Sequence, residues 1–427
     1  MISTLLRSNL LKSAGIYTFS RLINSAVPFL MIPVLTRYLT PSDYGIVAMF
    51  SILIGIATPF VGLNVHAAIS VKYFDRNRTD LPKYIGNCFY LLFISTAIFS
   101  AAAWLFSGTI SSFTAFPGDW LWAVVLVSFG QFFILVLMTL WQAEDRPVRY
   151  GIYQNLQTLT NIVLSVLLVV ALAKGWQGRI EAQIITIVLF AITGCILLYR
   201  NGWLKLSYDR SYMNHALKFG IPLIPHVLGA MLITQTDRIL IANMVSIADA
   251  GIYTIGFQLA NVIELLASSF NQAYAPWLYR HLSDDDFSMK KRIVKLTYLY
   301  FVLILVFAVF FAVAAPWFLS FFVGRAFLEA GRYIVWLAVG FSFCGMYYMV
   351  ANYIFFSGRT APLAWVTFFT AAINILFTYL LIKKNGPIGA AQASALAFFI
   401  SFLMTWLLSA AVYKMPWDIR RLFRNEA

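Results

Sequence analysis

Long apolar runs fill most of the chain and are separated by short polar connections. About twelve of the runs are near 20 residues long, the length at which an α-helix crosses a hydrocarbon core of about 30 Å. They are expected at 14–36, 45–66, 84–106, 120–141, 151–173, 182–199, 217–242, 251–275, 293–323, 333–355, 362–382 and 388–413. The pattern predicts an all-α integral membrane protein with about twelve transmembrane helices.

A short signature occurs twice, about half a chain apart. Residues 39–46 and 245–252 each join one long apolar run to the next, and the offset from Asp43 to Asp249 is 206 residues in a chain of 427. This spacing is expected if a bundle of about six helices occurs twice. We therefore predict an N-terminal six-helix lobe at 1–199, a cytoplasmic linker at 200–216, a C-terminal six-helix lobe at 217–413 and a cytoplasmic tail at 414–427.

Two lobes with an even number of spans have the same orientation in the membrane. The repeat is then parallel, related by an axis along the membrane normal, and a cleft between the lobes is the natural place for a substrate. A duplicated bundle of this kind is first of all a transporter architecture.

Composition and charge strengthen the membrane assignment and exclude a nucleic-acid partner. The chain is 61% hydrophobic and 11% charged, with a net charge of +14. Most of the 31 Lys and Arg residues fall in alternate connections, on the side that holds both termini. The positive charge therefore indicates a topology with both termini in the cytoplasm.

The sequence offers no recognisable catalytic centre. Cys88, Cys195 and Cys344 lie within predicted spans without metal-ligand spacing, and the four histidines are scattered. No phosphate-binding loop, zinc motif or exposed serine triad is present, and the predicted outer connections are short. We expect a protein that is not an enzyme and that needs no metal or other cofactor.

Two arginines in the first predicted span are candidates for binding a substrate. Arg21 lies deep in the span, and Asn24 follows it on the same helical face. Ionisable groups inside a membrane usually face a cavity or a partner, so Arg21 points either into a wet cleft or toward an ion pair on another helix. Arg37 lies near the outer end, where snorkelling explains it equally well.

Asp237 and Arg238 are adjacent in the seventh predicted span. Neighbouring residues are about 100° apart around a helix, so each needs its own environment. A structural link from Asp237 to another helix is one interpretation, and a role in ion coupling is the other. Arg238 is expected to point into the cleft toward an anionic group.

Glu264 is the sharpest single candidate for ion coupling. It belongs to a polar stripe on one face of the eighth predicted span, formed by Gln258, Asn261, Glu264, Ser268 and Asn271. Such a stripe must face protein or water rather than lipid. Gln258 and Asn261 are assigned to substrate binding, and Glu264 is either a carboxylate that takes up H⁺ or Na⁺ or a hydrogen-bonded packing residue.

Two weaker stripes contain only uncharged polar groups. They are formed by Tyr150, Gln154, Gln157, Asn161 and Ser165, and by Thr367, Thr370, Asn374 and Thr378. Amide and hydroxyl groups suit sugars or other hydrated cargo. Such groups also hold membrane helices together, so either reading applies.

The residues of both halves resemble those of a known family. The stretch from Arg21 to Gly45, with Pro28, Pro33 and Leu-Thr-Arg-Tyr-Leu-Thr-Pro at 35–41, is similar to the first two spans of the polysaccharide transport family. The start of the second half shows the same similarity, with Phe-Gly-Ile-Pro at 219–222, Asp237-Arg238, and Gly-Ile-Tyr at 251–253. This family contains the Wzx-type O-antigen and capsule-repeat flippases of the multidrug/oligosaccharidyl-lipid/polysaccharide exporter superfamily.

The resemblance implies a two-lobed, MATE-like exporter fold and alternating access. It implies an undecaprenyl-pyrophosphate-linked oligosaccharide as the substrate, moved across the plasma (inner) membrane of a bacterium, with a polysaccharide polymerase and a chain-length regulator as partners. It also implies a cationic cleft, into which Arg21 and Arg238 fit by position. A cation-coupled multidrug exporter of the same fold is the alternative, and a membrane-embedded transferase or polymerase is a third.

Overall fold

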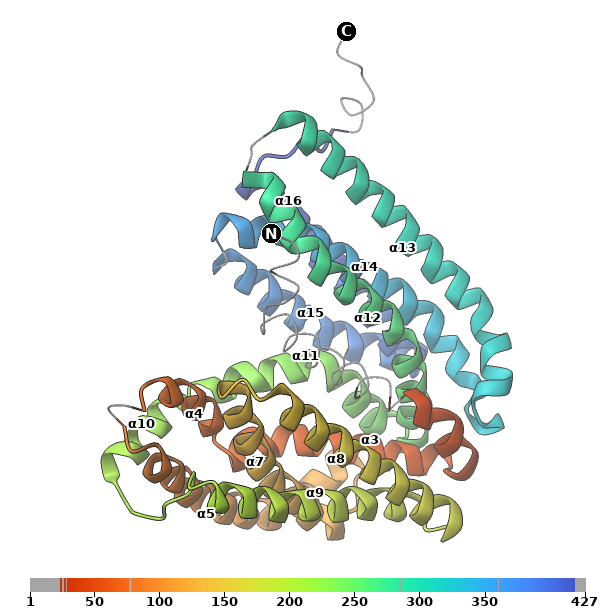
Figure 1. Cartoon of the computed structure of the whole chain (residues 1–427). Helices are drawn as coiled ribbons and strands as arrows, with labels where there is room; N and C mark the ends of the chain where they lie inside the picture. Colours follow the sequence, from red (N-terminus) through yellow and green to blue (C-terminus); the bar gives the residue numbers. More distant parts are fainter. Residues whose placement is uncertain are drawn as a thin grey trace. The chain divides into compact units, whose positions relative to one another are not determined.

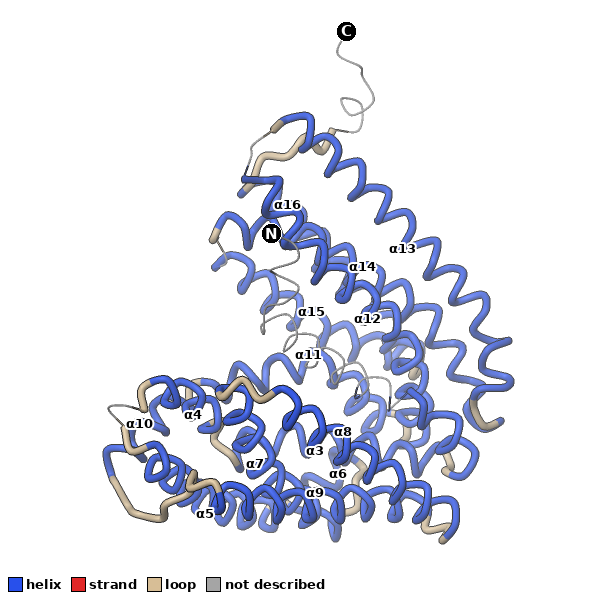
Figure 2. Tube along the Cα trace, viewed as in Figure 1, coloured by secondary structure: helices blue, strands red, loops and turns tan. Residues whose placement is uncertain are grey.

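The computed structural model describes residues 24, 27, 29–76, 79–283, 286–359 and 361–418 (Figure 1). Almost all of these residues are helical, and the described ranges contain no strand (Figure 2). The prediction of an all-α fold is therefore confirmed.

Ten helices among the described residues are long and apolar enough to cross a membrane, or up to eleven if the bent pair Arg210–Gly229 and Thr234–Met244 is one span. Only part of the first predicted span is described, as the short apolar helix Phe29–Tyr38. The observed spans follow the predicted ones closely, so a fold of about twelve transmembrane helices agrees with the structure.

The chain divides into two compact units, Met1–Gln235 and Thr236–Ala427. The first contains the long helices α3 (Pro41–Val61), α5 (Leu81–Leu105), α7 (Leu121–Ala143), α8 (Pro147–Val166) and α9 (Gly175–Arg200), and the short helices α4 (Val65–Phe74), α6 (Ser107–Thr114) and α10 (Arg210–Gly220). Helix α11 (Leu223–Met244) contains the division. The second unit continues with α12 (Ile247–Ser283), α13 (Phe287–Phe322), α14 (Gly331–Ser357), α15 (Ala361–Asn385) and α16 (Ile388–Val412).

Helix α14 is central to the second unit, where it packs against α12, α13 and α16. Small residues allow this close packing: a Cβ atom at Gly340 would lie 3.0 Å from the Cα atom of Ala395 in α16. Without a hydrophobic driving force between helices in lipid, such close backbone contacts are a main source of helix association.

The repeated signature forms a hydroxyl cap at two helix starts. At α3, the Thr40 N–H donates to Asp43 Oδ2 (2.9 Å) and the Asp43 N–H donates to Thr40 Oγ1 (3.1 Å). At α12, the Asp249 N–H donates to Ser246 Oγ (3.0 Å), whose hydroxyl donates to Asp249 Oδ2 (2.7 Å). In both places the hydroxyl accepts from the N–H of an aspartate three positions later, a group that the helix leaves unpaired. At α3 the aspartate also accepts from the Thr40 N–H. The signature is therefore a helix-start signal that occurs once in each unit.

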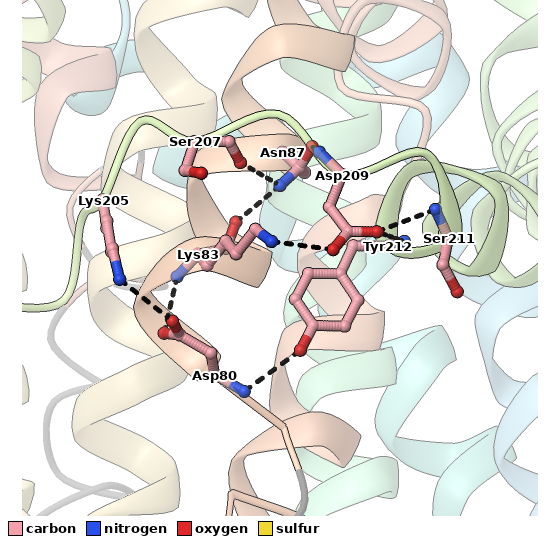
Figure 3. Close-up of polar contacts among 8 residues, drawn as sticks. All are labelled: Asp80, Lys83, Asn87, Lys205, Ser207, Asp209, Ser211 and Tyr212. Carbon is pink, nitrogen blue, oxygen red and sulfur yellow. Dashed lines mark hydrogen bonds and ion pairs between the residues drawn. The ribbon is translucent and has the colours of Figure 1, made fainter.

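The predicted linker is held against the start of α5 by a set of contacts that we call the linker latch (Figure 3). Lys83 Nζ lies 2.8 Å from Asp209 Oδ2, and Lys205 Nζ lies 3.3 Å from Asp80 Oδ2. The Asn87 side chain donates to the Ser207 carbonyl and accepts from the Asp209 N–H, both at 2.8 Å. The latch lies wholly within the first unit. The boundary between the two compact units follows Gln235, which is C-terminal to the predicted linker at 200–216. The division into two sets of six spans stays a prediction.

The latch combines charge with close backbone packing. A Cβ atom at Gly86 would lie 2.1 Å from the Lys205 carbonyl oxygen, so only glycine lets the linker approach α5 here. The hydrogen bond from Lys83, with backbone N–H groups of Tyr212 and Ser211, holds the pKa of Asp209 below its usual range. A lowered carboxylate pKa stabilises the fold above the ordinary aspartate range, and this contribution is lost as pH falls through the lowered value. The latch is therefore expected to persist at neutral and mildly acidic pH.

Asp209→Ala is expected to loosen the linker from α5. The substitution removes the ion pair with Lys83 and the cap on the start of α10, so amide hydrogen exchange in 203–216 should rise several-fold in the solubilised protein. Asp119→Ala, at an exposed position of the same unit, is the control and should leave this exchange unchanged. Equal exchange in Asp209→Ala and the native protein would contradict the latch.

Candidate functional site

Asp237, on α11, has a carboxylate that is surrounded by hydroxyl groups from three other helices of the second unit. Its side chain is 3% exposed. Oδ2 accepts hydrogen bonds from Tyr253 of α12 (2.7 Å) and Ser394 of α16 (2.5 Å), and Oδ1 accepts one from Thr378 of α15 (3.3 Å). One carboxylate thus connects four helices.

Asn374 lies on the same face of α15 as Thr378. The two residues are one helical turn apart, and Asn374 is 6% exposed. Among the described residues, the Asn374 side-chain oxygen has no hydrogen-bond partner. A carboxylate, hydroxyls and an amide oxygen are the ligands that hard cations prefer, and a buried carboxylate can instead hold a proton.

Arg238 is buried beside Asp237 and packs on an aromatic ring. Its guanidinium carbon lies 4.1 Å from the centroid of the Phe257 ring of α12, within the range of a cation–π interaction. The prediction that Arg238 faces an anionic cargo is not tested by this contact. The surroundings of the two adjacent side chains differ: Asp237 contacts hydroxyls of three helices, and Arg238 contacts an aromatic ring.

The polar stripe on α12 contacts α14 at several levels. Glu264 Oε1 accepts a hydrogen bond from Tyr348 (2.7 Å), and Asn271 accepts one from Asn352 (2.7 Å). Gln258 and Asn261 are half-buried on the same helix. The expectation that the stripe faces protein or water agrees with these contacts, and the ion-coupling role of Glu264 stays a prediction.

The predicted residues of the first span contribute little to a described site. Arg21 lies outside the described residues, and Arg37 is exposed. Asn24 donates to Asn155 (3.0 Å) and accepts from Thr158, both on α8. The sequence candidates therefore fall into separate groups: Asn24 in the first unit, Asp237 with Arg238 in the second, and the α12 stripe also in the second.

Sequence reasoning missed most of the partners of the candidate carboxylates. Thr378 was one of the residues of a predicted stripe, and Tyr253 was part of the Gly-Ile-Tyr motif of the resemblance. Ser394 lies in a run of small residues, and Tyr348 in an aromatic-rich span. Neither gave a signal, because the rotation of each helix toward its neighbours decides which side chains meet.

Comparisons with known proteins place the chain in a family. An uncharacterized membrane protein of Haemophilus influenzae is 23% identical over 371 residues, which cover 86% of this chain and 89% of the relative. A structure of the lipid II flippase MurJ in an inward closed conformation is similar with a TM-score of 0.73, 13% identity, and coverage of 92% of this chain and 87% of that chain.

A second solved structure shows the same architecture. An inward-facing multidrug resistance MATE family transporter of the MOP superfamily has a TM-score of 0.64 at 14% identity, covering 94% of this chain and 96% of the other. At these identities the likeness establishes the fold. The sequence profile described as "Polysaccharide biosynthesis protein" matches residues 34–332, so the chain belongs to this family of polysaccharide biosynthesis proteins and has the fold of MurJ and the MATE transporters.

Proposed function

We propose that the protein is a flippase for undecaprenyl-pyrophosphate-linked oligosaccharide repeat units. It moves them from the inner to the outer leaflet of the bacterial inner membrane by alternating access, for the synthesis of O-antigen, capsule or exopolysaccharide. The observation that carries the proposal is the polysaccharide biosynthesis match over 34–332. The fold shared with a lipid II flippase supports it, because that protein also handles a lipid-linked substrate.

The topology and partners follow from this role. Both termini and the latched linker lie in the cytoplasm, in agreement with the distribution of Lys and Arg along the chain. The flipped repeat units are then available on the outer face to a polysaccharide polymerase and its chain-length regulator.

The pyrophosphate of the cargo requires positive charge inside the membrane. Arg21 and Arg238 supply it, with Arg37 near the end of the first span. Uncharged groups at Asn24, Gln258 and Asn261 bind the neutral part of the substrate. An arginine offers a planar fork that matches phosphate oxygens, whereas lysine retains only the charge.

Ion coupling centres on Asp237. Three hydroxyls and the nearby positive charge of Arg238 stabilise the charge of Asp237, so taking up H⁺ or Na⁺ changes the electrostatic balance of the buried site. An ion bound more tightly in one arrangement of the helices biases a two-state transport cycle. Glu264, bonded to Tyr348 across α12 and α14, is a second coupling carboxylate.

For the cargo, Arg21→Ala and Arg238→Ala are each expected to lower flipping by about tenfold in proteoliposomes, with Arg21→Lys restoring part of the rate. Loss of one charge-assisted hydrogen bond costs about 1.5–3 kcal/mol, so tenfold is the lower bound of the expected effect. The assay follows an undecaprenyl-pyrophosphate-linked tetrasaccharide as it becomes accessible to an added glycosidase. Arg200→Ala, at an exposed helix end, is the matched control.

Two outcomes of this assay would overturn the proposal. Normal flipping by the double alanine variant would rule out a cationic cargo site at these residues. Transport of a cationic dye by the native protein, without movement of the lipid-linked glycan, would identify a multidrug exporter instead.

For coupling, Asp237→Asn is expected to abolish the response of flipping to an imposed H⁺ or Na⁺ gradient while slow downhill flipping remains. Glu264→Gln should weaken the response. Asparagine keeps the size of the side chain and accepts hydrogen bonds but neither ionises nor neutralises a cation. If either variant responds to the gradient as strongly as the native protein, the substituted residue has only a packing role.

A further inference from the structure

Helix α8 has two faces of opposite character. Tyr150, Gln154, Gln157, Asn161 and Ser165 step by four, three, four and four residues, so they form one polar face. The opposite face carries exposed apolar side chains, which suit contact with lipid: Ile152, Leu156, Leu159 and Val163. Helix α8 packs on α7 and α9 within the first unit.

The amides of the polar face are not used for helix packing. Gln154, Gln157 and Asn161 are half-buried, and within the part of the chain that the structure describes their side chains have no hydrogen-bond partner. In hydrocarbon, an amide without a partner is unfavourable. Among the described residues the Gln154 side-chain oxygen is buried, whereas no side-chain oxygen or nitrogen of Gln157 or Asn161 is both buried and unpaired. We therefore expect Gln157 and Asn161 to face water or a polar ligand.

Contacts at the edge of this face show that it is an ordered surface. Asn24 hydrogen-bonds Asn155 and Thr158, and the hydroxyl of Ser165 donates to the Asn161 carbonyl (2.6 Å). The flanking polar groups thus have partners, while the amides of Gln157 and Asn161 remain available among the described residues. On α12, by contrast, Glu264 and Asn271 have partners on α14.

The chemistry of the face selects a class of ligand. The sequence has no charged residue from Tyr150 to Val166, so the face offers no positive charge to a pyrophosphate. Primary amides both donate and accept, which matches the many hydroxyls of a glycan. From Gln154 to Asn161 the face extends about 10 Å along the helix, enough to contact more than one sugar ring.

We propose that the α8 amide face, formed by Gln157 and Asn161 with Gln154 at its edge, binds the glycan of the lipid-linked substrate during its passage. This inference rests on the proposed function and adds a glycan subsite separate from the arginines that bind the pyrophosphate. The face makes transport depend on how many sugars the lipid carries, because a single sugar reaches fewer of the amides than an oligosaccharide does.

The decisive experiment compares two substrates in proteoliposomes. These are undecaprenyl-pyrophosphate carrying one N-acetylglucosamine and the same lipid carrying a tetrasaccharide. Each lost hydrogen bond weakens binding by about fivefold, so the Gln157→Ala/Asn161→Ala variant, which loses two, should flip the tetrasaccharide about 25-fold more slowly, with less than a twofold change for the single sugar. Gln177→Ala, an exposed glutamine on α9, is the matched control.

The outcomes separate this inference from the proposed function. If the native protein flips neither lipid, the proposed function is wrong and the glycan subsite is overturned with it. If the native protein flips both and the variant slows both equally or neither, the proposed function stands and the glycan subsite is wrong.

Cysteine accessibility tests the site without transport. In a background that lacks Cys88, Cys195 and Cys344, cysteines at positions 157 and 161 should react with a membrane-impermeant thiol reagent. Cysteines at 152 and 159, on the apolar face, should not. The tetrasaccharide lipid should slow the reaction at 157 and 161. Absence of reaction there would show a face covered by protein, and reaction without protection would show hydration alone; either result contradicts the proposal.

Discussion

A polar group inside a bilayer needs a partner, water or a ligand, and this constraint explains the arrangement of the polar residues in this protein. An unpaired amide or carboxylate in hydrocarbon costs several kcal/mol. The second unit meets this demand internally at Asp237, where Tyr253, Thr378 and Ser394 supply three hydroxyl donors. The first unit leaves the amides of α8 without partners among the described residues.

The paired carboxylate of Asp237 and the unpaired amides of α8 suit different ligands in one transport cycle. A single buried carboxylate among hydroxyl groups suits one small ligand, either a hard cation or a proton. Unpaired amides spread over two helical turns suit a larger ligand with many hydroxyls. The contacts between α12 and α14, through Glu264 and Asn271, hold those two helices together within their unit.

The sequence predicted the helices well because hydrophobic length depends on each segment alone. It also detected the repeat through Asp43 and Asp249, since helix capping is a local interaction between residues three apart. The sequence identified Asp237 as a charged residue inside a span that requires polar partners, but it did not identify Ser394 as one of them. Contacts across 157 residues depend on how α11 and α16 rotate and pack, which periodicity does not encode. The polar face of α8 was visible as a stripe, whereas the lack of partners for its amides required the structure.

The claim that Asp237 is the ion site is tested most directly by recording charge movement from the reconstituted protein on a solid-supported membrane. After a jump in Na⁺ concentration or in pH, the native protein is expected to displace charge in response to one of the two ions. Asp119→Asn, which alters an exposed residue, is the control and should behave as the native protein does. Asp237→Asn is expected to show no such displacement. Equal displacement in Asp237→Asn and the native protein, or none in the native protein with either ion, would contradict the account.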